Sequence, residues 1–143
     1  MLVAAYRTLG GPPPRPADAA PLLEAASAAL TESVAALSTI LASPSAVDAD
    51  TVRRGRRATS RLQGALDRVD SIESVSDDDA EVRDELRGAA DDLAWAWRIA
   101  AGGIATDGIL AALNALCDHA AAGADRAAGL RGGAALGEPG HGA

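Results

Sequence analysis

Residues 19–42 of this chain read AAPLLEAASAALTESVAALSTILA, and this stretch decides the fold. Its apolar residues recur in steps of three and four, the spacing of one face of an α-helix, at Leu23, Ala26, Leu30, Val34, Leu37 and Leu41. The stretch contains two acidic residues and no basic residue. We therefore expect a helix that is flanked by other helices on several sides.

The residues around this stretch fix its two ends. Asp18 is a preferred N-cap residue, and Pro21 falls in the first turn, where a helix does not need the missing N–H of proline. Ser43 precedes Pro44, and a residue before proline avoids the helical conformation. The first helix is therefore predicted over residues 19–42.

Three more segments have the helical spacing of apolar residues. We expect helices over about residues 51–74, 76–101 and 106–131. The glycines at positions 123 and 129 are places where the last helix is expected to fray.

Acidic and hydroxyl residues mark the starts of two of these helices. Asp48 or Asp50 can cap the second helix. Ser76 followed by Asp77–Asp79 matches a capping box, with negative charge at the positive end of the helix dipole. These signals support the predicted order of helices.

The composition agrees with an all-α fold. The 143 residues include 36 alanines and no phenylalanine, and alanine is the best helix former. The short connections favour one antiparallel, up-and-down bundle of about four helices over residues 17–131. The Pro/Gly-rich residues 1–16 and the Gly-rich residues 132–143 are expected to form flexible, disordered tails.

The net charge and the single cysteine limit the kinds of function and compartment that we expect. All 13 basic residues are arginine, and 20 acidic residues give a net charge of −7, which opposes general nucleic-acid binding. Cys117 is the one cysteine, so it is expected to be a small core residue in a reducing, cytoplasmic compartment. No segment has 18 apolar residues without a charge, so no transmembrane span is expected.

Six arginines lie within sixteen positions near the start of the second helix. Five of them share one arc of the helix, at Arg53, Arg54, Arg57, Arg61 and Arg68, and Arg56 lies beside them. Cations are disfavoured near a helix N-terminus, so a compensating anion is one interpretation, and a solvated polar face is the other. The candidate anion-binding residues are Arg53, Arg54, Arg57 and Arg61.

An acidic segment of the chain itself could also compensate the positive charge of these arginines. In an antiparallel hairpin of the second and third helices, facing residue numbers sum to about 150, so Arg68 would meet the acids at 81–85. The arginines at 53–57 would lie opposite residues 93–97 and remain without acids.

Two neighbouring tryptophans differ in their predicted exposure. Trp97 belongs to the apolar stripe of the third helix, whereas Trp95 lies about 160° from it, on the outer face that it shares with Ile99. Trp95 and Ile99 are therefore the candidate partner-binding residues. The alternatives are that Trp95 covers the edge of a groove, or that it makes a cation–π contact with an arginine, for which Arg53 or Arg54 lies near.

We find no pattern of catalytic or metal-binding residues. Cys117, Asp118 and His119 are consecutive, so their side chains diverge on a helix and cannot converge on one metal ion or one proton. We expect no metal site, no cofactor and no enzymatic activity.

The sequence thus predicts a non-catalytic helical bundle that mediates protein–protein interaction or self-assembly, including a homodimer. An anion- or nucleic-acid-contacting module that uses the Arg53–Arg68 face is the first alternative. The apolar start Leu2-Val3-Ala4-Ala5-Tyr6-Arg7, followed by Ala-rich helices, is similar in texture to the cytoplasmic helical regions of fusaric-acid-resistance-type exporters. That resemblance implies the second alternative, a soluble helical segment of a larger membrane transporter-type system.

Overall fold

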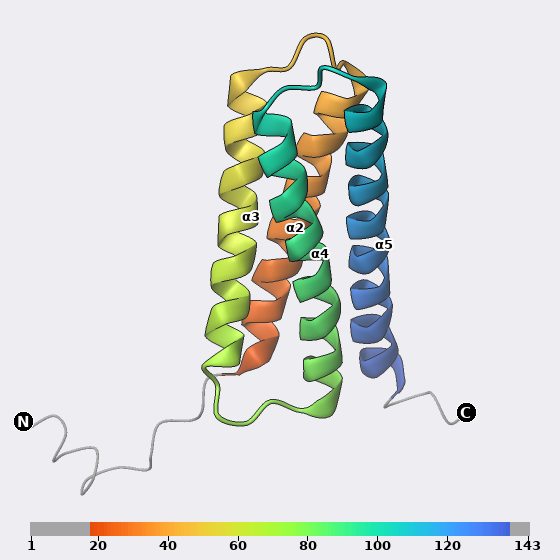
Figure 1. Cartoon of the computed structure of the whole chain (residues 1–143). Helices are drawn as coiled ribbons and strands as arrows, with labels where there is room; N and C mark the ends of the chain where they lie inside the picture. The colour runs from red at the N-terminus through yellow and green to blue at the C-terminus, as the bar shows by residue number, and fades with distance from the viewer. Residues whose placement is uncertain (1–17, 138–143) are drawn as a thin grey trace, which may run out of the picture.

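The computed structural model describes residues 18–137, which form four antiparallel helices (Figure 1). The helices are α2 (Ala19–Ala42), α3 (Ala49–Asp70), α4 (Asp77–Ala101) and α5 (Asp107–Gly137). No strand occurs in this part of the chain. The predicted all-α, up-and-down bundle is confirmed.

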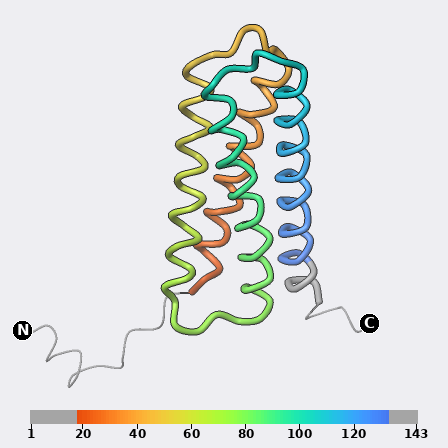
Figure 2. The backbone as a smooth tube through the Cα atoms, viewed as in Figure 1, coloured from red at the N-terminus to blue at the C-terminus, as the bar shows by residue number. Residues whose placement is uncertain are grey.

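The four helices pack as two close hairpins. Figure 2 traces α2 and α4 in one direction and α3 and α5 in the other. α2 packs mainly on α3, and α4 mainly on α5. α2 also contacts α4 across the centre of the bundle, whereas the described parts of α3 and α5 make no contact. The small alanine side chains allow this close diagonal approach.

Side-chain caps begin the first three helices, as the sequence predicted. Asp18 Oδ1 accepts a hydrogen bond from the backbone N–H of Ala20 at 3.0 Å. Asp48, rather than Asp50, is the N-cap of α3. Ser76 Oγ accepts from the N–H of Asp79 at 3.1 Å at the start of α4. Each cap satisfies a backbone donor that has no partner within the helix.

Two helices have different bounds from those predicted. α3 ends at Asp70 rather than at residue 74, because Ser71 binds the last turn: its Oγ donates to the carbonyl of Arg68 at 2.7 Å. α5 continues to Gly137, beyond the predicted end of the bundle at residue 131. It does not fray at Gly123, which is buried where α5 approaches α4; a Cβ there would lie 3.3 Å from the Cβ of Ala89.

The predicted flexible tails fall mostly outside the described residues. The segment 1–16 and residues 138–143 lie outside them entirely. Residues 132–137, which the sequence assigned to the C-terminal tail, belong to α5.

The core consists of aliphatic side chains from all four helices. The leucines among the largest fully buried side chains are Leu23, Leu30, Leu37, Leu62, Leu66, Leu86, Leu93 and Leu113. Cys117 is buried with them, as the sequence predicted, and its Sγ lies 3.5 Å from Ser38 Oγ. Alanines fill the remaining space between the helices. The core is therefore thin and depends on close helix packing.

One aromatic side chain completes this core. Trp97 is 2% exposed, and its ring lies directly on the backbone of Gly55, where an added Cβ would be 1.9 Å from Trp97 Cζ2. Only glycine leaves room for the indole at this position of α3. The burial of Trp97 was predicted from the sequence, but its glycine partner was not.

A chain of buried hydrogen bonds accompanies the ring and links three helices. Trp97 Nε1 donates to Ser33 Oγ at 2.9 Å, and Ser33 Oγ lies 2.8 Å from Thr59 Oγ1. Thr59 donates its hydroxyl proton to the carbonyl of Gly55 at 2.9 Å, so Ser33 is the donor to Thr59. Every polar side-chain atom in this series of hydrogen bonds has a partner. The hydrogen bonds offset the free-energy cost of burying these atoms away from water.

One described helix, α2, is long and apolar enough to cross a membrane by length and composition. Its mean hydropathy is 1.4 over the most apolar window, although the helix includes Glu24 and Glu32. The sequence prediction of no transmembrane span was based on the lack of an uncharged stretch of 18 apolar residues. Because α2 contains two glutamates, that criterion did not identify it. Core helices of soluble proteins share these properties, and one face of α2 is buried in the bundle.

Candidate functional site

Trp95 lies on the outer face of α4 and is 57% exposed, as predicted. The guanidinium carbon of Arg98, one turn further along the same helix, lies over its ring at 5.0 Å from the centroid. The predicted cation–π contact therefore exists, but Arg98 makes it instead of Arg53 or Arg54. A cation–π contact of this kind at an exposed site is worth about 0.5–1 kcal/mol.

Ile99 does not form the exposed pair with Trp95 that the sequence predicted. It is half-buried and packs against the core. α5 lies against this flank of α4: Asp92, on the same flank as Ile99, is hydrogen-bonded to His119 of α5. Trp95 is therefore an isolated aromatic side chain rather than part of an apolar patch.

Arg98 separates two hollows on the surface of the bundle. The first has a volume of about 240 Å³ and is lined by Asp91, Ala94, Trp95 and Arg98. The second lies between α3 and α4, has a volume of about 280 Å³, and is lined by Arg56, Thr59, Ser60, Gln63, Ala94, Trp97, Arg98 and Ala101. Because the hollows share Ala94 and Arg98, we treat them as one surface, the α3/α4 groove.

The arginines predicted to bind an anion are largely engaged within the protein. Arg53 forms an ion pair with Asp50 in the first turn of its own helix, and Arg61 pairs with Glu32 of α2. Arg54 Nη2 lies 3.5 Å from Thr51 Oγ1. Arg57 has no ion pair with a described acid. The four residues therefore do not form one free anion site.

The acidic cap of α3 explains why arginines are tolerated so close to the N-terminus. The hydrogen bond from Thr51 Oγ1 to Asp48 Oδ2, at 3.0 Å, is the main reason why the pKa of Asp48 lies below its usual value. The backbone N–H of Asp50 and the charge of Arg54 lower this pKa further. Asp48 thus stays ionised and compensates both the helix dipole and the nearby arginines.

The ion pairs between α3 and α4 have the opposite polarity to that predicted. Arg87 of α4 reaches Asp67 at 3.3 Å and Asp70 at 2.6 Å on α3. Arg83 of α4 also lies 3.8 Å from Asp70. Arg68, which the sequence paired with the acids at 81–85, has no ion pair with a described acid.

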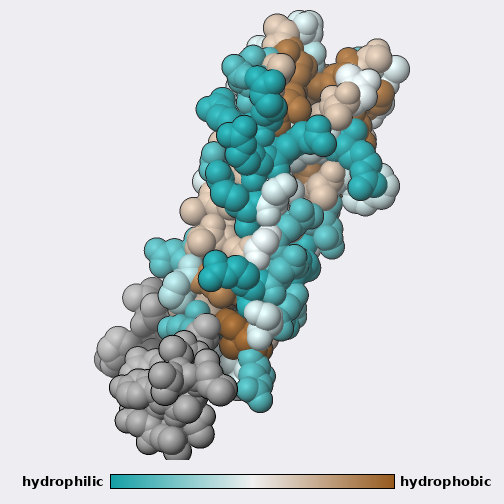
Figure 3. Space-filling model, turned by 90° about the vertical axis from the view of Figure 1, so that its left-hand side faces the viewer, coloured by the Kyte–Doolittle hydropathy of each residue, from teal (hydrophilic) through white to brown (hydrophobic). Residues whose placement is uncertain are grey.

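The face that carries α3 is covered mainly by hydrophilic side chains, with smaller apolar areas between them (Figure 3). Arg54, Arg56, Arg57 and Arg68 are exposed residues of α3 that lack an ion pair with a described acid. Of these four, Arg56 lines the α3/α4 groove, where it joins Arg98 of α4.

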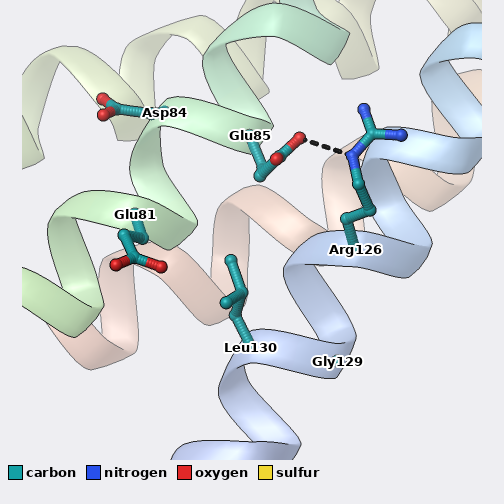
Figure 4. A pocket seen from close by; sticks show the side chains of 6 residues that line it. All are labelled: Glu81, Asp84, Glu85, Arg126, Gly129 and Leu130. Atoms are coloured by element: carbon teal, nitrogen blue, oxygen red, sulfur yellow. Dashed lines mark hydrogen bonds and ion pairs between the residues drawn. The ribbon is translucent and has the colours of Figure 1, made fainter.

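Another hollow lies between α4 and α5 and has a volume of about 480 Å³. In Figure 4, Glu85 and Arg126 meet at one end of it, at 2.9 Å, while Glu81 and Leu130 lie nearer the other end. Asp84 points away from this ion pair, toward the far side of α4. The hollow is open, and its carboxylates do not converge on one point.

The remaining side chains that could take part in catalysis or metal binding do not lie together. His119 is exposed and paired with Asp92, whereas Cys117 is buried beside Ser38. Within residues 18–137, no three histidine, cysteine or acidic side chains are arranged to hold a metal ion.

Sequence reasoning missed the α3/α4 groove and the role of Arg98. The spacing of Trp95 and Arg98 by three residues on one helix is the signal that could have revealed their contact. The hairpin register predicted from the sequence places residues 53–57 opposite 93–97, close to this juxtaposition, but it does not specify that Arg56 and Arg98 line one hollow.

Comparison with known proteins gives no relative. The chain matches no protein-family model, no curated protein sequence and no solved structure. Its function is therefore inferred from the chemistry of its own surface.

Proposed function

We propose that this protein is a non-catalytic interaction module whose partner, another protein or a second copy of the chain, binds the outer face of α4 at Trp95. The observation that carries the proposal is the 57% exposure of this indole. Tryptophan is enriched among the residues that dominate the binding energy of interfaces. Among the described residues, Val47 is the other exposed large hydrophobic side chain.

The surroundings of Trp95 favour a docking role. The guanidinium of Arg98 lies over the ring, so a partner that covers Trp95 also meets hydrogen-bond donors beside it. The hollow beside the ring gives a partner side chain a place to enter. A single exposed aromatic ring beside a groove is the arrangement of an interface anchor.

A non-catalytic role is supported by the separation of the reactive groups. Cys117 is buried in the core, and His119 is held by Asp92 at the surface of the bundle. A nucleophile and a general base need to lie within hydrogen-bond reach of each other.

A capture experiment tests the proposal. The tagged wild-type chain is compared with Trp95→Ala and with Val47→Ala, the matched control at the other exposed large hydrophobic residue. We expect the partner to be retained by the wild type and by Val47→Ala, and Trp95→Ala to weaken binding by about 30-fold or more. Equal capture by all three proteins would contradict the proposal.

Self-assembly is tested on the same variants by sedimentation at high micromolar concentration. If the partner is a second copy, the wild type sediments as a dimer, and Trp95→Ala shifts the equilibrium to the monomer. A wild-type chain that remains monomeric at this concentration excludes the second copy and leaves a separate protein as the partner.

A further inference from the structure

We infer that the α3/α4 groove binds a short acidic segment of a partner protein, with its carboxylates held between Arg56 and Arg98. This inference rests on the proposed function and specifies the chemistry of the partner. It starts from two arginines on different helices, Arg56 and Arg98, that line one hollow of about 280 Å³.

The lining of this hollow is suited to anions. Alongside the two arginines, Ser60 and Gln63 of α3 provide hydrogen-bond donors, and none of the eight lining residues is acidic. Ala94 and Ala101 of α4 have small side chains that leave the space open. A carboxylate that enters the hollow therefore meets donors and no opposing negative charge.

Arg56 and Arg98 have no carboxylate partner in the described chain, a property that they share with Arg54, Arg57, Arg68 and Arg131, but they are the two that line one hollow together. Arg53, Arg61, Arg83, Arg87 and Arg126 each form an ion pair with an aspartate or a glutamate. Arg56 and Arg98 form none with a described acid, although the chain has 20 acidic residues and a net charge of −7. The hollow between α3 and α4 is thus a local positive surface in an acidic protein, whereas the adjoining hollow beside Trp95 is also lined by Asp91.

The stacking of Arg98 on Trp95 leaves it able to bind a carboxylate. A guanidinium group stacks on an aromatic ring through its face, whereas its N–H groups donate from its edge. The buried indole of Trp97 supports the floor of the hollow and is fixed by its hydrogen bond to Ser33. A peptide can therefore place an acidic side chain between the arginines and a neighbouring apolar side chain against Trp95.

Charge favours a short acidic segment over other acidic ligands. Two arginines neutralise few phosphates, and the net charge of −7 repels a nucleic acid along its whole length. A second copy of the chain brings its own net charge of −7 over its whole surface, whereas a separate partner protein can present a short acidic segment without an overall negative charge. Of the three ligands, a short acidic segment is therefore attracted by the two arginines with the least repulsion from the net negative charge of the protein.

A titration with hexaglutamate tests this inference, and hexaglutamine serves as the uncharged control peptide. The readouts are the affinity and the NMR signals of the Trp95 indole N–H and the Arg98 side chain in the full chain. We expect hexaglutamate, but not hexaglutamine, to shift these signals. Because each arginine makes a charge-assisted hydrogen bond, Arg56→Gln and Arg98→Gln should each weaken binding about tenfold or more.

Arg68→Gln is the matched control variant. Arg68 is also an exposed arginine of α3 without a described acidic partner, but it lies outside the groove. Its removal changes the net charge by the same amount, so we expect an affinity within about twofold of the wild type. Circular dichroism of all three variants establishes that the helices are intact.

Several results would overturn the inference. These are no binding of hexaglutamate, equal binding of hexaglutamine, or an equal loss of affinity in Arg68→Gln. Tighter binding of a DNA oligonucleotide at the same arginines would assign the groove to nucleic acid. Self-association that is lost in Arg98→Gln would assign it to a second copy. If hexaglutamate does not bind while capture of a partner still depends on Trp95, the groove inference fails and the proposed function stands.

Discussion

Trp95 and Trp97 lie two residues apart on α4 and occupy opposite environments. Trp97 is 2% exposed, lies on the backbone of Gly55 and donates a hydrogen bond to Ser33. Trp95 is 57% exposed and contacts the guanidinium of Arg98. Two residues correspond to about 200° of rotation around a helix, which turns one indole into the bundle and the other outward.

The difference between the two side chains separates stability from binding. The burial of Trp97 removes its large ring from water and satisfies its N–H, so it stabilises the fold. The exposure of Trp95 contributes little to folding and leaves apolar area for a partner to cover. The variants below test whether the two roles divide in this way.

The largest expected effect is that of Trp97→Ala. Removal of a buried tryptophan leaves a cavity and costs about 3–5 kcal/mol of unfolding free energy. Trp95→Ala, the matched change on the surface, should alter this free energy by less than about 0.5 kcal/mol. Urea unfolding followed by circular dichroism measures both, and equal destabilisation by the two variants would contradict the comparison.

Gly55→Ala tests how closely the buried ring approaches α3. The added Cβ would lie 1.9 Å from Trp97 Cζ2, so the indole has to move, and such overpacking costs about 1–3 kcal/mol. Gly64→Ala is the control on the same helix, because nothing lies within 4 Å of its Cβ position. It should stabilise the helix by about 0.5–1 kcal/mol. Thermal unfolding of both variants should therefore show shifts of opposite sign.

Ser33→Ala tests the hydrogen-bond chain around Trp97. The change removes the acceptor of the Trp97 N–H and the donor to Thr59, which leaves a buried indole N–H without a partner. We expect a loss of about 1–3 kcal/mol in unfolding free energy. Ser60→Ala, at an exposed position of α3, is the control and should change it by less than about 0.5 kcal/mol. A loss in Ser33→Ala no larger than in this control would argue against the buried chain of bonds.

The smallest expected effect concerns the cap of the helix that carries Gly55. The pKa of Asp48 is lower in the folded protein than its usual value of 3.8, because the folded state donates hydrogen bonds to the carboxylate. The stabilisation is therefore present above this value and is lost as the pH falls through the lower, folded-state pKa. Asp48→Asn should reduce the difference in urea midpoint between neutral pH and about pH 3. An unchanged pH dependence in this variant would mean that the carboxylate does not stabilise the cap.

The helices and the opposite exposure of the two tryptophans could be predicted from the sequence. The three- and four-residue spacing around Leu23, Leu30 and Leu37 specifies both the helical structure and its buried face. The rotation of about 100° per residue around a helix places Trp97 on the buried face of α4 and Trp95 on the exposed face. These features depend on one helix at a time, so a single sequence contains them.

The features that the sequence did not predict depend on which helices are neighbours. Ile99 is half-buried on the flank of α4 against which α5 lies, and Arg61 is paired because α2 brings Glu32 beside it. The approach of Trp97 to Gly55 requires the register of α3 against α4 to within one residue. Helix periodicity gives the apolar face but not the side on which the next helix lies.

The most direct test of the central claim is hydrogen exchange at the two indole N–H groups, measured by NMR in the full chain. The account predicts one slowly exchanging indole, that of Trp97 bonded to Ser33 in the core, and one that exchanges rapidly, that of exposed Trp95. Two protected indoles, or two that exchange rapidly, would contradict the division between a tryptophan for stability and a tryptophan for binding.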